Sequence, residues 1–559
     1  MKVLIIGGVA GGATAAARLR RLDENAEIII IERSGYVSYA NCGLPYYIGG
    51  EITDRGALTL QTPESFKSRF AIDVRVKEKA VSIDRAAKTV RIRRLSDGTE
   101  YSESYDKLIL SPGAHPVVPQ IPGADSKKIM TLRTVEDTFR IYDYVSEHAP
   151  RSAVIIGGGF IGLETAENLK NRGLEVTLLQ RGSHVMPPLD EDMAAPVHTY
   201  MRQKGIGLRL KASVTGFKET ETGITAVTPE EEFTADMAIM AIGVMPESAL
   251  AKGAGLKLGI KDAIVVDTHM RTSDENIYAV GDAAEITDFV SGQRTVVPLA
   301  GPANKQGRIA ADNICGIDSE YKGAQGSSVL KLFDMTVAST GCNEKTAARY
   351  GFDYDYALLT SASHATYYPG AKSMSIKVLF EKGTGRILGA QIIGFDGADK
   401  RIDVLAAAIR ANMTASDLTE LDLAYAPPYS SAKDPVNMAG YVIENIVTGK
   451  VKQIHWAEAL AGDGLLLDTR TDFEYARGHI DGAMHIPLDS LRERLSELPK
   501  DRTIYVHCQS GLRSYIACRI LSQHGYDCYN VAGGYGYYAA VAAGACPAED
   551  GTGPCGLKR

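Results

Sequence analysis

The segment Val37-Ser38-Tyr39-Ala40-Asn41-Cys42-Gly43-Leu44-Pro45 carries one cysteine, and its surroundings decide what chemistry that thiol can do. A dithiol redox centre with the spacing Cys-x4-Cys would need a second cysteine five residues after Cys42, but that position is Tyr47. The oxidised form of Cys42 is then a sulfenate or a mixed disulfide with an outside thiol. The sequence therefore predicts a thiol whose redox partner is a small molecule.

A second reactive cysteine, Cys508, opens the loop Cys-Gln-Ser-Gly-Leu-Arg after a predicted strand over 503–506. A loop of this kind with Gly511 turns successive N–H groups inward and stabilises a thiolate or persulfide at Cys508. Arg513 is expected to position an anionic sulfur donor. An inactive module kept only for docking would be expected to have lost the cysteine.

The elements that position Cys42 begin with a glycine-rich turn. An apolar strand over 2–6 runs into Gly7-Gly8-Val9-Ala10-Gly11-Gly12, followed by a helical pattern and a strand over 28–31 that ends in Glu32. This is a βαβ unit for a dinucleotide, in which the glycines let the backbone approach a pyrophosphate and the acid binds ribose hydroxyls. The middle glycine of the motif is replaced by Val9.

A second unit of the same kind follows at Gly157-Gly158-Gly159-Phe160-Ile161-Gly162, with a helix beginning near Leu163 and a strand over 175–179. Its motif is complete, so the chain is expected to hold two dinucleotides, a flavin and a nicotinamide. The second strand ends in Gln180 rather than an acid. The preference between NADH and NADPH therefore stays open.

Two further segments, 108–114 and 276–282, each combine a strand with a tight turn. Through their order relative to the two glycine motifs, the chain resembles the two-dinucleotide-domain flavoprotein family. In that family the Asp282 position binds the ribityl chain of the flavin. The resemblance implies FAD and NAD(P)H as cofactors. The cofactor-binding positions that it implies are Gly7, Gly12, Glu32, Arg33, Val81, Ser111, Gly113, Asp282, Ala300, Gly157, Gly159, Gly162, Gln180 and Gly243.

Ser38-x3-Cys42, with Val9-Ala10 before it, resembles the coenzyme A disulfide reductases within this family, over residues 1 to about 445. The resemblance implies Cys42 at a helix start, where a helix N-terminus favours thiolate. It implies coenzyme A contacts at Thr14, Arg18, Arg21, Ser38 and Asn41 from one subunit and at Tyr367, Tyr425 and Lys433 from the other. The basic side chains suit phosphates, and a tyrosine hydroxyl would protonate or orient the leaving sulfur. For Arg18 and Arg21, solvated helix charges remain the alternative.

Related NADH oxidases and peroxidases carry a histidine where this chain has Ala10. Peroxide reduction releases a poor oxygen leaving group that benefits from a proton donor, whereas a thiolate or hydropersulfide leaves readily. Disulfide or persulfide substrates are therefore favoured. An NADH oxidase or peroxidase, and a sulfur-carrier or redox-sensing protein, remain the alternatives.

The expected fold class is α/β, with two Rossmann-like dinucleotide-binding domains, an α+β dimerisation domain and a C-terminal α/β domain that resembles rhodanese. The sequence 465–470, 478–487 and 503–514 carries the rhodanese resemblance. The predicted boundaries are 1–115 and 265–325 for FAD, 116–264 for NAD(P)H, 326–447 for the homodimer interface, 455–545 for rhodanese and 546–559 for a flexible tail. Cys546 and Cys555 in this tail are expected to be incidental.

Composition limits the remaining classes of function. The 559 residues exceed one hydrophobic core, and the formal net charge of −7 favours neither nucleic acid nor a membrane surface. Eight irregularly spaced cysteines predict no disulfide framework and no metal site, and they point to the cytoplasm. No signal peptide or membrane span is expected.

These observations predict a homodimeric flavoprotein in which NAD(P)H reduces FAD and reduced FAD passes electrons to the oxidised form of Cys42. Its substrate is a coenzyme A disulfide, persulfide or polysulfide. The fused rhodanese leads to the hypothesis that Cys508 takes up sulfane sulfur and that coenzyme A carries it to Cys42.

Overall fold

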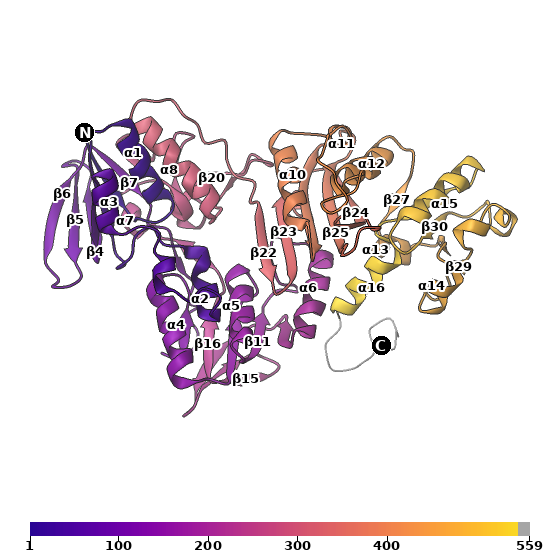
Figure 1. Cartoon of the computed structure of the whole chain (residues 1–559), viewed down its shortest axis with the longest axis horizontal. Helices are drawn as coiled ribbons and strands as arrows, with labels where there is room; N and C mark the ends of the chain where they lie inside the picture. The colour runs from indigo at the N-terminus through magenta and orange to yellow at the C-terminus, as the bar shows by residue number, and fades with distance from the viewer. Residues whose placement is uncertain (546–559) are drawn as a thin grey trace. The chain divides into compact units, whose positions relative to one another are not determined.

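The computed structural model describes residues 1–545, which fall into two compact units (Figure 1). Unit 1 comprises residues 1–182 and 205–326, and unit 2 comprises residues 183–204 and the chain from 327 onward. The predicted tail 546–559, with Cys546 and Cys555, lies outside the described residues. The predicted NAD(P)H domain, 116–264, includes residues 183–204, but in the structure these residues belong to unit 2.

The first sheet of unit 1 is parallel and has the order β19-β7-β1-β2-β3. The three central strands β7, β1 and β2 consist largely of buried Val, Ile and Leu, as in a parallel sheet that is covered on both faces. Helix α1 (Gly11–Leu22) follows β1 and packs on α8 (Ala300–Ile314). The strands are β1 (Lys2–Ile6), β2 (Glu27–Glu32), β3 (Asp73–Val76), β7 (Lys107–Leu110) and β19 (Ile277–Ala279).

The second sheet of unit 1 repeats this plan with the parallel order β12-β11-β10-β16-β9. Helix α5 (Phe160–Asn171) begins three residues before the predicted start, because Gly159 is its N-cap. Helix α4 (Val135–His148) follows β9. The strands are β9 (Ile129–Thr131), β10 (Ser152–Ile156), β11 (Glu175–Gln180), β12 (Ile206–Leu210) and β16 (Met237–Met240).

Smaller elements complete unit 1. Helix α2 (Leu44–Gly49), entered through the 3-10 turn η1 (Asn41–Gly43), packs on both α5 and α4. The other helices are α3 (Pro63–Phe70), α7 (Ala249–Gly253) and the 3-10 turns η2 (Arg55–Leu58), η3 (Ile260–Asp262) and η4 (Gly281–Ala283). One small sheet contains β4 (Glu78–Asp84), β5 (Thr89–Arg94) and β6 (Glu100–Ser104), and another contains β13 (Gly216–Glu219), β14 (Ile224–Val227) and β15 (Glu232–Ala235). A third pairs β8 (Ala114–Pro116) with β17 (Val244–Pro246), and a fourth contains β18 (Ile264–Val265), β20 (Ala284–Thr287) and β21 (Arg294–Thr295).

Unit 2 contains an antiparallel sheet of order β22-β23-β26-β25-β24, which helix α10 (Ala398–Arg410) covers. Helix α6 (Glu191–Gln203), from residues 183–204, belongs to this unit (Figure 1). The strands are β22 (Ser328–Leu332), β23 (Met335–Gly341), β24 (Tyr354–Ala362), β25 (Ser373–Glu381) and β26 (Ile387–Gly394), and the further helices are α9 (Glu344–Arg349), α11 (Ala415–Thr419) and α12 (Pro435–Val447).

The C-terminal part of unit 2 has a parallel sheet of order β27-β31-β30-β28-β29. The strands are β27 (Gln453–Ile454), β28 (Leu465–Asp468), β29 (Met484–His485), β30 (Ile504–His507) and β31 (Cys528–Val531). The helices are α13 (Trp456–Ala461), α14 (Asp472–Ala476), α15 (Leu512–Gln523) and α16 (Gly534–Ala545), with 3-10 turns η5 (Leu488–Ser490) and η6 (Leu495–Glu497). The predicted α/β fold class is confirmed.

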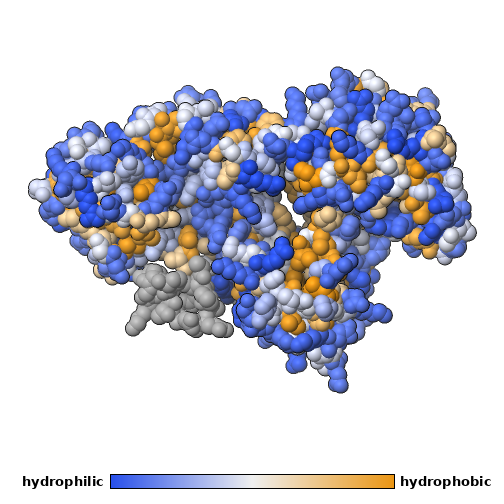
Figure 2. All heavy atoms as spheres, turned by 180° about the vertical axis from the view of Figure 1, so that it is seen from behind, coloured by the Kyte–Doolittle hydropathy of each residue, from blue (hydrophilic) through white to orange (hydrophobic). Residues whose placement is uncertain are grey.

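The surface is largely hydrophilic on the face shown in Figure 2, with hydrophobic residues gathered in separate patches. Among residues 1–545, no helix has both the length and the apolar character needed to cross a membrane.

Candidate active sites

The two glycine motifs have the same backbone geometry. Gly7 and Gly157 have φ angles of +98° and +110°, a region that favours glycine. A Cβ on Gly12 would lie 2.0 Å from the carbonyl oxygen of Gly7, and a Cβ on Gly162 would lie 1.9 Å from that of Gly157. The last glycine of each motif therefore lets the helix pack directly against the turn, as a dinucleotide site requires.

In each βαβ unit, the last side chain of the second strand accepts a hydrogen bond from the glycine turn. The backbone N–H of Gly8 donates to Glu32 at 2.9 Å, and the N–H of Gly158 donates to the side-chain oxygen of Gln180 at 3.1 Å. Burial raises the pKa of Glu32, although the N–H groups of Gly8 and Ser34 oppose that shift. Gln180 thus performs without charge the structural role that Glu32 performs in the first motif.

A cavity of about 830 Å³ opens beside the first glycine turn, within unit 1. Its size is in the usual range for a cofactor site. The cavity, the positive-φ glycine and the acid at the end of β2 fit a flavin dinucleotide. The predicted residues that line it are Gly7, Thr14, Glu32, Arg33, Ser38, Asn41, Cys42, Val81, Ser111, Gly113, Asp282 and Ala300.

Cys42 lies in η1 and exposes its thiol at the wall of this cavity. Tyr47, at the position of a second thiol, is buried against Phe139 and accepts a hydrogen bond from Arg55 at 3.1 Å. Cys42 precedes the N-terminus of α2, but its other surroundings act against the thiolate form. The pKa of Cys42 is raised, first by burial and then by the carboxylate of Glu164. The thiol is accessible, yet the cavity wall removes part of its hydration.

No sequence motif indicated Glu164 or Arg133 as residues of this site. Glu164, on α5, accepts a hydrogen bond from the Tyr46 hydroxyl at 3.4 Å, and burial raises its pKa to about 7. Arg133 donates to Asp282 at 2.7 Å and lines the cavity. The partners of Glu164 and Arg133 are 118 and 149 residues away, so no local pattern points to either residue.

The predicted phosphate ligands of unit 1 differ in their surroundings. Thr14 lies in the cavity wall and donates to Asn304 at 2.8 Å. Arg18 forms an ion pair with the largely buried Asp312, with Nε and Oδ1 2.7 Å apart. Arg21 is exposed on α1. Arg18 is therefore already neutralised, whereas Arg21 presents its guanidinium to solvent.

The residues predicted to come from the other subunit lie in unit 2. The hydroxyls of Tyr367 and Tyr425 are 2.7 Å apart, and the two side chains are 75% and 46% exposed. Their mutual hydrogen bond raises the pKa of Tyr425. Lys433 is also exposed. The structure brings the two tyrosines together and leaves both open to a ligand.

Cys508 lies at the carboxyl end of β30 and is 1% exposed. The N–H of Gly511 donates to its sulfur at 3.2 Å, and the Ser514 hydroxyl lies 3.5 Å from the same sulfur. The amide of Tyr535, in α16, donates to the Cys508 carbonyl at 2.7 Å. Two donors, the Gly511 N–H and the Ser514 hydroxyl, thus lie within reach of the sulfur, an arrangement that suits a thiolate or persulfide.

Arg513 is engaged by a residue that the sequence did not indicate. Its guanidinium pairs with both carboxylate oxygens of Glu474, which lies in α14. The ion pair lowers the pKa of Glu474 to about 2. The predicted anion ligand of this site is therefore neutralised by an internal carboxylate.

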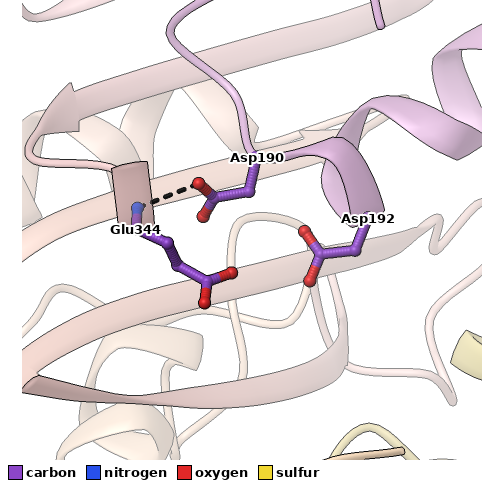
Figure 3. Close-up of side chains that lie close together, drawn as sticks. All are labelled: Asp190, Asp192 and Glu344. Atoms are coloured by element: carbon purple, nitrogen blue, oxygen red, sulfur yellow. Dashed lines mark hydrogen bonds between the residues drawn. The ribbon is translucent and has the colours of Figure 1, made fainter. Parts of the chain in front are cut away.

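Three acids elsewhere in unit 2 point toward a common centre: Asp190, Asp192 and Glu344 (Figure 3). The N–H of Glu344 donates to Asp190 at 2.9 Å. The fully buried ammonium of Lys377 lies 3.0 Å from Asp190 and 2.8 Å from Asp192, and it also pairs with Glu344. The ammonium of Lys377 therefore balances part of the negative charge of these three acids.

Comparison with protein families divides the chain into three matched regions. Residues 1–307 match the family described as pyridine nucleotide-disulphide oxidoreductase, and residues 327–435 match the dimerisation domain of that family. Residues 453–540 match the rhodanese-like domain. This family binds flavin and nicotinamide cofactors, in agreement with the two glycine motifs.

Similar proteins include the coenzyme A disulfide reductase of Staphylococcus aureus, 38% identical over 441 residues that cover 79% of this chain and 99% of the relative. The structure of reduced Bacillus anthracis CoADR-RHD is 50% identical, with a TM-score of 0.95, and the match covers 97% of this chain and 98% of that one. An NAD-dependent persulfide reductase from A. fulgidus is 41% identical, with a TM-score of 0.91 and coverage of 96% and 100%.

Proposed function

Because the chain belongs to the pyridine nucleotide-disulphide oxidoreductase family, we propose that it uses NAD(P)H and FAD to reduce the disulfide or persulfide of coenzyme A. Cys42 is the redox-active thiol, and the C-terminal rhodanese module handles sulfane sulfur at Cys508. An NADH oxidase activity is not favoured, since the structures that match 97% and 96% of this chain are CoADR-RHD and an NAD-dependent persulfide reductase.

The observation that carries this proposal is the place of Cys42. Its exposed thiol lies in the wall of the cavity that also contains the first glycine turn, and the position of a second thiol is the buried Tyr47. A single thiol beside a dinucleotide site can form a mixed disulfide only with a molecule that enters from outside.

In the proposed reaction, the Cys42 thiolate attacks one sulfur of the disulfide R–S–S–R. A Cys42–S–S–R bond forms, the original S–S bond breaks, and R–S⁻ leaves with a proton from solvent. A flavin held at the Gly7 turn, reduced by NAD(P)H held at the Gly157 turn, would supply the two electrons that cleave this mixed disulfide. Cys42 and the second R–S⁻ are then released. For a persulfide R–S–SH, attack on the outer sulfur releases R–S⁻ and leaves Cys42 as the persulfide.

Chain residues give this reaction its binding sites. Ser38 and Asn41 flank Cys42 in the cavity wall, and the exposed Arg21 suits a phosphate group. The dimerisation domain matched at 327–435 supports a homodimer. Tyr367 and Tyr425 of the second subunit would then orient the leaving sulfur, and Lys433 would bind phosphate.

The rhodanese module would supply the substrate. Cys508 takes a sulfur atom from a sulfane donor as a persulfide, and coenzyme A thiolate attacks the outer sulfur and carries it away as coenzyme A persulfide. Cys42 then receives that sulfur. This order of steps is supported by the presence of both sulfur sites on one chain.

The test compares Cys42→Ser and Cys508→Ser in the purified enzyme. Cys42→Ser should abolish NAD(P)H oxidation by coenzyme A disulfide, whereas Cys508→Ser should retain it. With polysulfide as substrate, Cys508→Ser should also lose activity. If Cys508→Ser leaves polysulfide-dependent oxidation unchanged while Cys42→Ser abolishes it, the sulfur relay is wrong and the reductase assignment stands.

A sulfur-carrier or redox-sensing protein is the second candidate, because Cys508 alone could form a persulfide. It predicts slow turnover with every disulfide and fast persulfide transfer at Cys508. Fast NAD(P)H oxidation by O₂ or peroxide without a disulfide would instead indicate an oxidase or peroxidase.

A further inference from the structure

Two surface loops of unit 2 carry the pair Tyr367 and Tyr425. Tyr367 lies in the loop 363–372 between β24 and β25, and Tyr425 lies in the loop 420–434 between α11 and α12. A cavity of about 520 Å³ adjoins Tyr425, so part of its side chain is not packed against protein. Among the described residues, each hydroxyl has the other as its hydrogen-bond partner, at 2.7 Å. The positions of the two hydroxyls therefore depend on how the two loop backbones are fixed.

The side chain of Arg401, on α10, reaches both loops and is 1% exposed. Its Nη2 donates to the Ser363 carbonyl at 2.9 Å in the first loop and to the Ser430 hydroxyl at 3.0 Å in the second. Ser363 precedes Tyr367 by four residues, and Ser430 follows Tyr425 by five. One guanidinium thus joins the two loops close to the tyrosines.

Asp434 completes this joint from the start of α12. Its Oδ2 accepts hydrogen bonds from Arg401 Nη2 at 3.1 Å and from the Ser430 hydroxyl at 2.6 Å, and its Oδ1 accepts from the N–H of Val436 at 3.0 Å. The loops also meet directly, because the N–H of Ala365 donates to the Ser430 carbonyl at 2.9 Å. Arg401, Ser430 and Asp434 are all buried, so water does not readily replace a contact that is lost here.

We infer that Arg401 is a positioning residue for Tyr367 and Tyr425. Together with Ser430 and Asp434, its guanidinium fixes the backbones of both loops so that the two hydroxyls meet. This role rests on the proposed function, in which the tyrosine pair orients the sulfur that leaves from the disulfide. Arg401 itself is buried and acts through the tyrosines.

The physical reason lies in the small tolerance of the tyrosine pair. The two hydroxyls carry two protons, of which one forms the mutual hydrogen bond and the other remains available to the leaving sulfur. An O–H···O bond requires an O–O distance of about 2.5–3.0 Å, so a shift of one loop by about 1 Å would break it. A misplacement of about 1 Å can lower a rate about 100-fold. Loss of the buried joint should therefore slow the disulfide step although both tyrosines remain.

The first test is kinetic and uses Arg401→Lys in the purified enzyme. Lysine keeps a positive charge beside Asp434, but one ammonium cannot reproduce the planar fork of donors that reaches both loops. The kcat for reduction of coenzyme A disulfide should fall about tenfold, whereas KM should change by less than about twofold. The reduction of ferricyanide by NAD(P)H involves no disulfide and should be unchanged.

Arg470→Lys is the matched control. Arg470 and its partner Asp468 are 2% and 0% exposed, and Arg401 and Asp434 are 2% and 3% exposed, so both substitutions disturb a buried ion pair in unit 2. Arg470→Lys should leave the kcat for coenzyme A disulfide unchanged. An equal loss in the two variants would show a general effect of destabilisation and would overturn the inference.

A double-mutant cycle tests whether Arg401 acts through the tyrosines. In the background Tyr367→Phe/Tyr425→Phe, Arg401→Lys should cause no further loss of kcat. Ser430→Ala removes one link of the same joint with little change in shape and should give the same pattern with a smaller loss. A loss that adds to that of the tyrosine variant, or a wild-type kcat in Arg401→Lys, would contradict the positioning role.

Hydrogen–deuterium exchange tests the joint without substrate. Exchange in the peptides 363–372 and 424–433 should become faster together in Arg401→Lys, while exchange in β26 should stay as in the wild type. Unchanged exchange in both loops would overturn the inference at any level of activity. If the wild type does not reduce coenzyme A disulfide, the proposed function fails, and the exchange of the two loops still decides whether Arg401 holds them.

Discussion

Arg513 of the Cys508 loop and Glu474 form a bidentate ion pair, with Nη1–Oε2 and Nη2–Oε1 distances of 2.6 and 2.7 Å. Bidentate pairing of this kind uses the same face of the guanidinium that would bind an anionic sulfur donor. Glu474 therefore holds Arg513 in position and also competes with the donor for it.

This arrangement predicts that Glu474→Gln strengthens the binding of an anionic donor. With thiosulfate as the probe, the KM for sulfur loading of Cys508 should fall several-fold in Glu474→Gln and rise in Arg513→Ala. The pKa of Glu474 is lowered to about 2, so its contribution to stability is present above its unfolded pKa near 4.5 and is lost only as the pH falls toward 2. Ionisation of Glu474 should thus cause no break in the rate above pH 5.

The second glycine motif predicts different results for two alanine substitutions. Gly162→Ala forces a Cβ to within 1.9 Å of the Gly157 carbonyl oxygen, so it should destabilise the protein by several kcal/mol and lower its melting temperature. At Gly159, φ is −85° and a Cβ would meet no heavy atom within 4 Å. Gly159→Ala should therefore fold normally and lose affinity only for NAD(P)H, as measured by nucleotide titration. Equal melting temperatures for the two variants would contradict this account.

The buried Lys377 predicts a large effect on stability. Lys377→Met leaves Asp190, Asp192 and Glu344 without their shared cation, and removal of one partner of a buried ion pair costs about 3–5 kcal/mol. The loss should shrink as the pH falls, because protonation of the three acids relieves their repulsion. Lys382→Met, at an exposed pair with Asp353, is the matched control and should cost less than about 1 kcal/mol. Chemical denaturation at pH 5 and 8 measures both.

Glu164 also predicts a dependence of stability on pH. Its pKa is raised from 4.5 to about 7, so the folded protein binds this proton more tightly than the unfolded chain does. The resulting stabilisation is complete below pH 4.5 and is lost as the pH rises through 7. Relative to the wild type, Glu164→Gln should gain stability between pH 5 and 8, at about 1.4 kcal/mol per unit of pKa shift. A constant difference between the two proteins across this range would argue against the raised pKa.

Sequence patterns predicted the elements that local chemistry determines. The strand over 2–6 is β1, and the glycine turns at Gly7 and Gly157 have the backbone geometry that their motifs require. The loop at Cys508 was also predicted, because a strand, a cysteine and a glycine stand next to each other in the chain.

Contacts between distant segments could not be predicted in this way. Glu164 resembles any polar residue of an amphipathic helix until α2 packs on it, and its burial depends on that contact. Arg18 looked like a free phosphate ligand because Asp312 is far away in sequence. The raised pKa of Cys42 could not be predicted for the same reason, since its main cause is burial in the cavity wall, and Glu164 adds to it from a distant part of the chain.

Helix α16 has a consequence for how this chain could be divided. At its first turn, the amides of Tyr535 and Gly536 hold the Cys508 loop, and at its other end Arg202 of α6 donates to the Gly544 carbonyl at 3.0 Å. A Cβ on Gly544 would lie 2.4 Å from the Ala195 carbonyl oxygen, so the two helices fit without spare room. The rhodanese module is therefore not an independent appendage. A chain truncated before residue 453 would lack α16. Helix α6 would then lose a packing partner, although α6 itself lies in the sequence between β11 and β12 of the second sheet of unit 1.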